Sequence, residues 1–167
     1  VDRCFTWAAW ADKFDGRTKS VPIRGIAIAM NEPVGNITAF ARNEAPLSSL
    51  TEIIGAALAM GNRLTLVAAE GVPLIATDLV QVLDTSDIPA GVVNILTGSH
   101  EELAPQIGGH AAIDAVWSFS ELDLARTLEF EAANNLKRTW IAQGQPSDQA
   151  FLDAATEVKT IWVPYGE

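Results

Sequence analysis

The chain has 167 residues, of which 49% are hydrophobic, a mean hydropathy of +0.17 and a net charge of −10. This size and apolar content predict one globular domain with its own core and exclude a disordered chain. The negative charge disfavours nucleic acid and anionic membrane surfaces as partners. No apolar run approaches the roughly 18 residues of a membrane span, and no charged-then-apolar leader opens the sequence, so we expect a cytoplasmic protein.

Residues 4–14 form the first predicted helix, because their apolar residues recur at three- and four-residue spacing. Cys4 is the only cysteine of the chain, which excludes an internal disulfide and is too few for a thiolate metal site. It shares the apolar face with Trp7 and Ala8. We therefore interpret Cys4 as a packed core residue and not as a nucleophile.

A hairpin is predicted next, over residues 18–23 and 26–32, with alternating apolar residues on one face. An isolated hairpin is not stable in water, so it requires a third strand. The candidate is the β-rich segment 158–163, which no following helix covers. This segment is either an ordinary sheet edge or a subunit interface. We favour the interface, because an exposed apolar strand is a liability unless it pairs.

Between these segments, predicted strands and helices alternate. The strands are expected at 36–41, 63–68, 92–96, 114–118 and 138–142, and the helices at 47–59, 73–84, 101–108 and 121–133, with a further short helix at 148–155. The run Gly91–Gly98 is apolar on both faces, which is typical of a strand buried in a parallel sheet. The predicted fold class is α/β: a Rossmann-like five-stranded parallel sheet with helices on both faces, plus a small sheet of the hairpin and the C-terminal strand.

Two histidines are the remaining candidate metal ligands. His100 and His110 lie in loop-like surroundings, without a carboxylate or cysteine at ligand spacing. We interpret both as surface histidines and predict no metal site.

Several sequence blocks together resemble the cofactor domain of NAD(P)-dependent aldehyde dehydrogenases, in that family's order and spacing. These blocks are Trp10–Gly16, Asn31–Gly35, Ala56–Asn62, Pro89–Gly98, Ile113–Val116, Asn135–Arg138 and Thr156–Thr160. The resemblance covers nearly the whole chain. What is missing lies between about Pro146 and Thr156, where the family inserts its catalytic domain.

The resemblance divides the chain into a packing helix (1–16), oligomerisation strands (17–33 and 156–167) and a Rossmann cofactor domain that lacks the catalytic domain (34–155). It is closest to the truncated, non-catalytic C-terminal copy of family-sixteen aldehyde dehydrogenases. It implies as partner either a second copy of this chain, giving a homo-oligomer, or an attached aldehyde dehydrogenase domain, in both cases through the C-terminal strand.

Aldehyde oxidation needs a thiolate nucleophile, an amide that holds the oxyanion and a carboxylate base. The resemblance places the oxyanion-binding amide on Glu44, with Asn43 one residue away, and the base on Ala142. A carboxylate repels an oxyanion, and an alanine cannot take a proton. We therefore predict no catalytic residue in this chain.

The cofactor contacts implied by the resemblance are vestigial. The ribose-binding lysine falls on Val67, whereas Glu70 matches an acidic position near the ribose, and the pyrophosphate turn begins at Ser120. Glu121 and Asp123 follow that serine. A carboxylate and a phosphate about 5 Å apart repel each other by roughly 3 kcal/mol per pair of unit charges at an effective dielectric constant near 20. Only Glu70 and Ser120 remain as cofactor-binding candidates, and we expect no cofactor on this chain, although the parent family uses NAD or NADP.

Two tryptophans, Trp117 and Trp140, end the last two predicted strands, where they either fill the space of a cofactor or are ordinary core aromatics. The leading functional hypothesis is a structural and oligomerisation module of a longer NAD(P)-dependent aldehyde dehydrogenase. The alternatives are a nucleotide-binding module that retains NAD(P) affinity without chemistry, and a free-standing small enzyme that uses the cleft differently.

Overall fold

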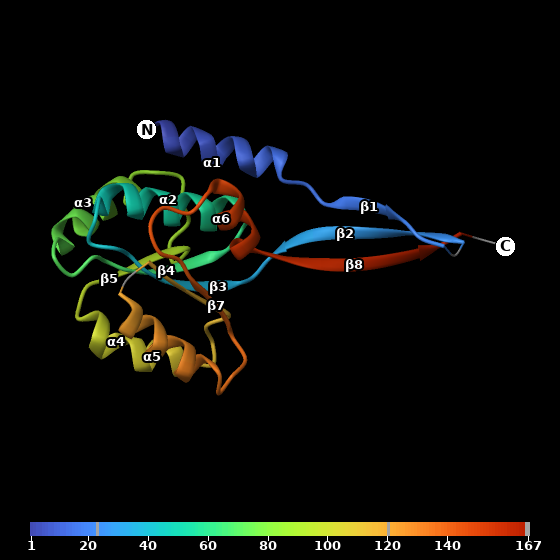
Figure 1. Cartoon of the computed structure of the whole chain (residues 1–167). Helices are drawn as coiled ribbons and strands as arrows, with labels where there is room; N and C mark the ends of the chain where they lie inside the picture. The colour runs from blue at the N-terminus through green and yellow to red at the C-terminus, as the bar shows by residue number, and fades with distance from the viewer. Residues whose placement is uncertain (23, 120, 166–167) are drawn as a thin grey trace.

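The computed structural model describes residues 1–22, 24–119 and 121–165, and it consists of a body and an arm (Figure 1). The body is a five-stranded sheet with its helices. The arm is a three-stranded antiparallel sheet that projects from the body and contains β1 (Arg17–Ser20), β2 (Gly25–Pro33) and β8 (Thr156–Pro164). The predicted strand 18–23 thus ends early, and its Ile23 lies outside the described residues.

The sheet of the body is parallel throughout, as predicted. Its strands are β3 (Asn36–Phe40), β4 (Arg63–Val67), β5 (Val93–Leu96), β6 (Ala115–Ser118) and β7 (Arg138–Ile141), in the order β5-β4-β3-β6-β7. From the central strand β3, the chain adds β4 and then β5 on one side of the sheet, and it then adds β6 and β7 on the other side. Between β3 and β6 the direction of winding reverses, which makes this pair the topological switch point.

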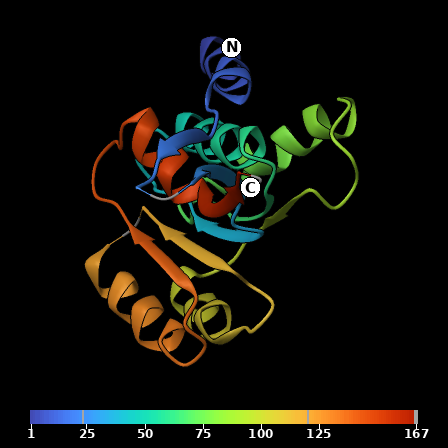
Figure 2. The same cartoon turned by 90° about the vertical axis from the view of Figure 1, so that its right-hand side faces the viewer.

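Helices cover both faces of this sheet, which confirms the predicted class (Figures 1 and 2). One face carries α1 (Asp2–Lys13), α2 (Pro46–Ala59), α3 (Pro73–Asp84) and α6 (Asp148–Ala155), and the other carries α4 (His100–Gly109) and α5 (Leu122–Ala132). Each face has its own buried cluster, because side chains of successive strand residues point to opposite sides. Phe40, Val67 and Val116, for example, pack towards α4 and α5.

An aromatic cluster fills the space between the sheet and α6. The Trp140 ring lies 5.2 Å from that of Trp117 and 5.0 Å from that of Phe151, edge to face, and Phe119 completes the contact. Trp117 is fully buried. Both tryptophans are therefore core aromatics, the second of the two interpretations considered from the sequence.

A clamp of charged side chains fixes α1 to the body. The guanidinium of Arg3 donates to both oxygens of Glu52 on α2, at 2.5 and 2.7 Å, and to Asp148 on α6 at 2.5 Å. The indoles of Trp7 and Trp10 donate to the same two carboxylates. These bonds to Arg3 lower the pKa of Asp148 and raise that of Arg3.

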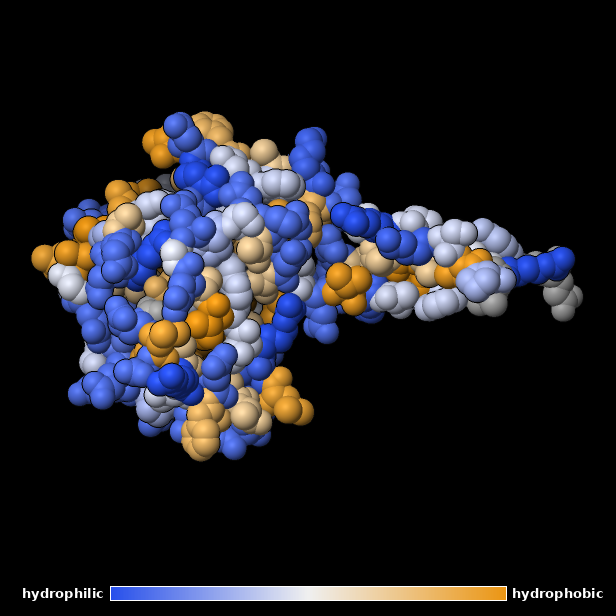
Figure 3. All heavy atoms as spheres, viewed as in Figure 1, coloured by the Kyte–Doolittle hydropathy of each residue, from blue (hydrophilic) through white to orange (hydrophobic). Residues whose placement is uncertain are grey.

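The arm has almost no core of its own. Ala27 is its one buried residue on β1 and β2 among those described, and on β8 only Thr156 is buried. The register places five apolar side chains on one face of the arm: Ile26, Ile28, Met30, Ile161 and Val163. We call this set the apolar face of the arm, and hydrophobic side chains are visible at the surface of the arm in Figure 3. Within the described residues, β8 pairs with β2 alone, so its outer edge is free.

The root of the arm is held by Asn62, a buried side chain at the start of β4. Its Oδ1 accepts from the backbone N–H of Gly35, between β2 and β3, at 2.9 Å. Its Nδ2 donates to the carbonyl oxygen of Ala155, at the junction of α6 and β8, also at 2.9 Å. One amide thus joins the two junctions through which β2 and β8 enter the body.

Apart from the end of β1, the element boundaries differ from the predicted ones by at most two residues. The strand expected at 92–96, for instance, begins at Val93, because Val92 donates its N–H back to Pro89 at 3.2 Å in a turn where Gly91 has a φ of +81°. The prediction that this strand is buried on both faces is wrong: β5 is an edge strand of the sheet, and its Leu96 is 41% exposed. Within the described residues, each helix is too short or too polar to cross a bilayer.

Candidate functional site

A cavity of about 320 Å³ opens at the switch point, beyond the carboxyl ends of β3, β6 and β7. In open α/β sheets, ligands bind at this position. The cavity is lined by the segment 41–44 after β3, by Phe119, Glu121 and Leu122 after β6, by Gln143 and Gly144 after β7, and by His100. Its position and composition make it the candidate functional site of the chain.

Charge in the cavity comes from Arg42, Glu44 and Glu121. The guanidinium of Arg42 donates from Nη1 to the carbonyl oxygen of Gly144 at 2.5 Å, while its buried Nε has no hydrogen-bond partner among the described residues. Glu121 occupies the N-cap position of α5, and its side chain makes no capping hydrogen bond there. A carboxylate thus lies at the helix N-terminus where a phosphate group would otherwise be attracted.

The positions that the resemblance assigns to chemistry are occupied by structural groups. Asn43 and Glu44 both line the cavity, but the Oδ1 of Asn43 already accepts from the backbone N–H of Gly71 at 3.1 Å. Ala142 packs against the larger buried cluster, and its backbone N–H donates to Ser118 at 3.0 Å. Position 142 therefore carries no general base, and position 44, to which the resemblance assigns the oxyanion-binding amide, carries a carboxylate that cannot donate.

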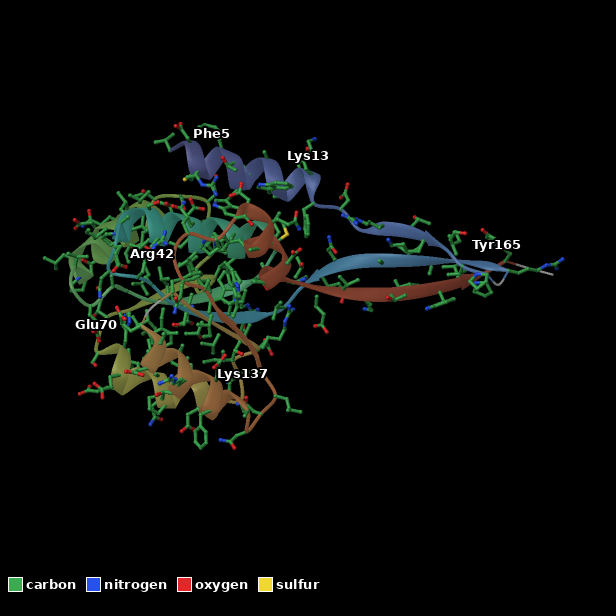
Figure 4. All side chains as sticks on the ribbon, viewed as in Figure 1. Phe5, Lys13, Arg42, Glu70, Lys137 and Tyr165 are labelled. Carbon is green, nitrogen blue, oxygen red and sulfur yellow. The ribbon has the colours of Figure 1, made fainter. Side chains whose placement is uncertain are left out.

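Glu70 lies outside this cavity. Glu70, which is labelled in Figure 4, lines a separate hollow of about 440 Å³ at the ends of β4 and β5. Its carboxylate accepts a hydrogen bond from the backbone N–H of His100 at the start of α4. This bond satisfies one of the free N–H groups at the helix N-terminus. Val67, to which the resemblance assigns the ribose-binding lysine, is fully buried. Ser120, the second cofactor-binding candidate, lies outside the described residues.

The prediction of a surface histidine at position 100 is wrong. His100 is 7% exposed, its Nε2 lies 2.7 Å from the carbonyl oxygen of Ala68, and its ring meets that of Phe40 edge to face at 5.2 Å. Because a carbonyl only accepts, Nε2 carries the proton. Helical periodicity carries no signal at this position, because His100 is the first residue of α4 and does not lie within the helix. His110 is exposed, as predicted.

Cys4 is also placed differently from the expectation. It does lie on the helix face predicted for it, but that face is only partly covered, so Cys4 is exposed on α1. It lines a groove that α1 forms with α2 and α3, and it does not line the cavity at the switch point. Among the described residues, no group of three or more His, Cys, Asp or Glu side chains is arranged to hold a metal ion.

Sequence reasoning missed Arg42. The available signal was its position, directly after the buried central strand, where a charged side chain must turn towards the carboxyl edge of the sheet. Its importance in the cavity depends on Gly144, which is 102 residues away, and such a pairing leaves no local pattern.

Comparison with known proteins identifies the family. The model of the aldehyde dehydrogenase family matches residues 1–160. The putative aldehyde dehydrogenase DhaS of Bacillus subtilis is 31% identical over 157 residues, covering 93% of this chain and 31% of DhaS. An aldehyde dehydrogenase of Agaricus bisporus is 32% identical over 162 residues, covering 96% of this chain and 32% of that protein.

Solved structures give the same result. A betaine aldehyde dehydrogenase of Staphylococcus aureus, solved with NAD+, superimposes with a TM-score of 0.79 at 26% identity, over 85% of this chain and 29% of that one. An indole-3-acetaldehyde dehydrogenase superimposes with a TM-score of 0.78 at 30% identity, over 87% of this chain and 35% of that one. The chain belongs to the aldehyde dehydrogenase family, and it spans about a third of the length of the curated relatives it matches.

Proposed function

We propose that this chain is a non-catalytic structural and assembly module of a longer NAD(P)-dependent aldehyde dehydrogenase, of the type of the truncated C-terminal copy in family-sixteen enzymes. The observation that carries the proposal is the content of the switch-point cavity. The resemblance assigns the amide, the pyrophosphate turn and the base of aldehyde oxidation to Glu44, Ser120–Glu121 and Ala142, and of these Glu44 and Glu121 line the cavity. The single thiol, Cys4, lies in α1 and outside that cavity.

The arm supplies the assembly surface in this proposal. Three residues of its apolar face, Met30, Ile161 and Val163, are exposed, and the outer edge of β8 is free within the described residues, a combination that suits the addition of another strand. The partner is a second copy or an attached aldehyde dehydrogenase domain. A cytoplasmic location is part of the same proposal, and the free Cys4 is consistent with a reducing compartment.

The assembly is tested by measuring the mass of the whole chain by light scattering. We expect a mass above the 17.8 kDa of one chain, and we expect Ile161→Asp, on the apolar face, to return it to the monomer value. The matched control is Thr160→Asp, the adjacent residue on the opposite face, which should leave the mass unchanged. A wild-type chain that stays monomeric at high concentration contradicts the homo-oligomer.

The proposed lack of catalytic activity is tested by incubating the chain with NAD or NADP and a series of aldehydes while following the absorbance of the reduced cofactor. We expect no turnover. Aldehyde oxidation that survives Cys4→Ala would support a free-standing enzyme with another nucleophile and would overturn the proposal.

A nucleotide-binding module is the alternative, and Arg42 is the observation that favours it. Its guanidinium, with the unpaired Nε, is a cationic group beside the cavity. Calorimetry with NAD and NADP decides between the two functions. Binding tighter than about 1 mM, or −4 kcal/mol, that Arg42→Ala abolishes would establish the alternative.

A further inference from the structure

The sheet edge at which the switch-point cavity opens is acidic. We call it the carboxyl edge, and it consists of the segments that directly follow the five parallel strands, 41–45, 68–72, 97–99, 119–121 and 142–147. The acidic residues in the sequence of these segments are Glu44, Glu70 and Glu121, and Arg42 is their one lysine or arginine. Figure 4 shows Arg42 and Glu70 on the side of the body that faces away from the arm. A ligand that approaches this edge therefore meets mainly negative charge.

Two helices begin at the carboxyl edge, and their N-termini decide whether the cofactors that the family implies, NAD and NADP, fit this chain. His100 is the first residue of α4 and Leu122 is the first residue of α5, and both line the switch-point cavity. Free backbone N–H groups at a helix N-terminus attract phosphate groups. The phosphates of a dinucleotide would therefore need free N–H donors at one of these helix ends, without a carboxylate beside them.

The N-terminus of α4 is already satisfied by the chain itself. The carboxylate of Glu70 accepts from the backbone N–H of His100, and the hydroxyl of Ser99 accepts from that of Glu102 at 3.4 Å. Glu101 and Glu102 add further carboxylates in the first turn. A phosphate does not fit at this helix end, because these donors are taken and the acidic side chains repel it.

The N-terminus of α5 carries a carboxylate that does not cap it. Glu121 is the N-cap residue, its side chain makes no capping hydrogen bond, and it lines the cavity. Among the described residues, Arg42 is the one lysine or arginine of the lining, and it donates to the carbonyl oxygen of Gly144. Glu44 lines the same cavity, so the carboxylates outnumber the guanidinium. A phosphate does not fit at this helix end either.

We infer that Glu121 is a selectivity residue, whose carboxylate excludes NAD, NADP and other phosphate-bearing ligands from the switch-point cavity. The inference rests on the proposed non-catalytic function. It assigns the loss of cofactor affinity to one charge at the α5 N-terminus, since a cavity of about 320 Å³ is still present there. Glu70 contributes less, because its carboxylate is bonded to the α4 backbone and lines a separate hollow. The charge of Glu44 is offset by Arg42 in the same segment.

The test measures the affinity of the whole chain for ADP, NAD and NADP by ligand-observed NMR, which detects millimolar binding. Wild-type affinity should be weaker than about 1 mM. Glu121→Gln keeps the bulk of the side chain and removes its charge, so it should tighten ADP binding by about tenfold or more. Glu121→Lys should tighten ADP binding further, and both gains should shrink as the salt concentration rises.

Asp123→Asn is the matched control. Asp123 lies in the first turn of the same helix, but its side chain is 95% exposed, pairs with Arg126 at 3.2 Å and does not line the cavity. This variant removes one negative charge from the chain, as Glu121→Gln does. It should change ADP binding by less than about twofold, because solvent screens an exposed charge. An equal gain in both variants would contradict the role of Glu121.

Three further results would overturn the inference. The first is ADP binding by the wild type as tight as that by Glu121→Gln. The second is no gain in either Glu121→Gln or Glu121→Lys, both of which should fold like the wild type because residue 121 is exposed. The third is a gain in Glu121→Ala alone, which would mean that bulk and not charge blocks the cavity. The non-catalytic function fails on a different result, aldehyde oxidation by the wild type, so the two failures are distinguishable.

Discussion

The body and the arm are built from similar β-rich sequence but differ in burial. All four residues of β6 in the body are buried, whereas eight of the nine residues of β8 in the arm are exposed. The difference lies in what covers them: helices pack on both faces of the body sheet and on neither face of the arm. Local sequence determines that a segment forms a strand, whereas the helices packed against the strand determine how much that strand contributes to the stability of the protein.

The largest expected effect comes from comparing two tryptophans, one in a strand of the body and one in a strand of the arm. Trp117 in β6 is 1% exposed and Trp162 in β8 is 56% exposed. Trp117→Ala should lower the free energy of unfolding by about 3–5 kcal/mol, because it leaves a cavity in the aromatic cluster. Trp162→Ala should cost less than about 1 kcal/mol. Urea denaturation of both variants measures the difference, and equal losses would show that the arm has a core of its own.

The next test concerns α1, which leads from the body into the arm. Arg3→Ala should lower the free energy of unfolding by about 2–3 kcal/mol, because Glu52 is 3% exposed and loses its cationic partner. This predicted loss is reduced for solvent screening of Arg3, whose side chain is 36% exposed. Arg126→Ala is the control, since its pair with Asp123 lies at the surface and should contribute within about 0.5 kcal/mol.

A smaller effect is expected at Glu70, and it separates the structural from the vestigial cofactor role. Glu70→Ala should cost about 1 kcal/mol, because the first N–H group of α4 loses its acceptor. Hydrogen exchange of the α4 amides should rise locally. If Glu70 instead acted only in cofactor binding, the stability and the exchange rates would both remain at their wild-type values.

The smallest effect depends on pH. Hydrogen bonding to Arg3 lowers the pKa of Asp148 below its ordinary value of 3.8. The stabilisation is therefore present above about pH 4, and it is lost as the pH falls through the lowered folded-state pKa. Asp148→Asn should be less stable than the wild type at neutral pH, and this difference should shrink in acid. A difference that stays constant over the acid range would contradict the role assigned to the clamp.

Much of the fold was predictable because its signals are local. Alternating strands and helices with turn residues between them predict the parallel sheet, and alternate apolar residues predict the arm hairpin. The clamp was not predictable, because Arg3 and Asp148 are separated by 145 residues and each is an ordinary charged residue in its own helix. The exposure of Cys4 was missed for a related reason: helical periodicity identifies an apolar face but not whether another element covers it.

The candidate site was predicted in part. The acidic residue at the α5 N-terminus and the alanine at 142 follow from the sequence and its resemblance, and Glu121 does line the cavity. The bond between Glu70 and the α4 backbone could not be predicted, since a carboxylate that could contact a ribose can equally accept from a helix N-terminus. Only the relative position of the ends of β4 and α4 distinguishes these roles.

The Asn62 side chain has a mechanical consequence. Two residues separate β2 from the central strand β3, and β8 follows α6 without a linker, so the arm has no flexible hinge at these two junctions. Because one amide bonds both junctions, a pull or twist on the arm is transmitted directly to the centre of the sheet. Force spectroscopy should find that Asn62→Ala makes the arm yield at lower load than the body, whereas in the wild type the two give way together.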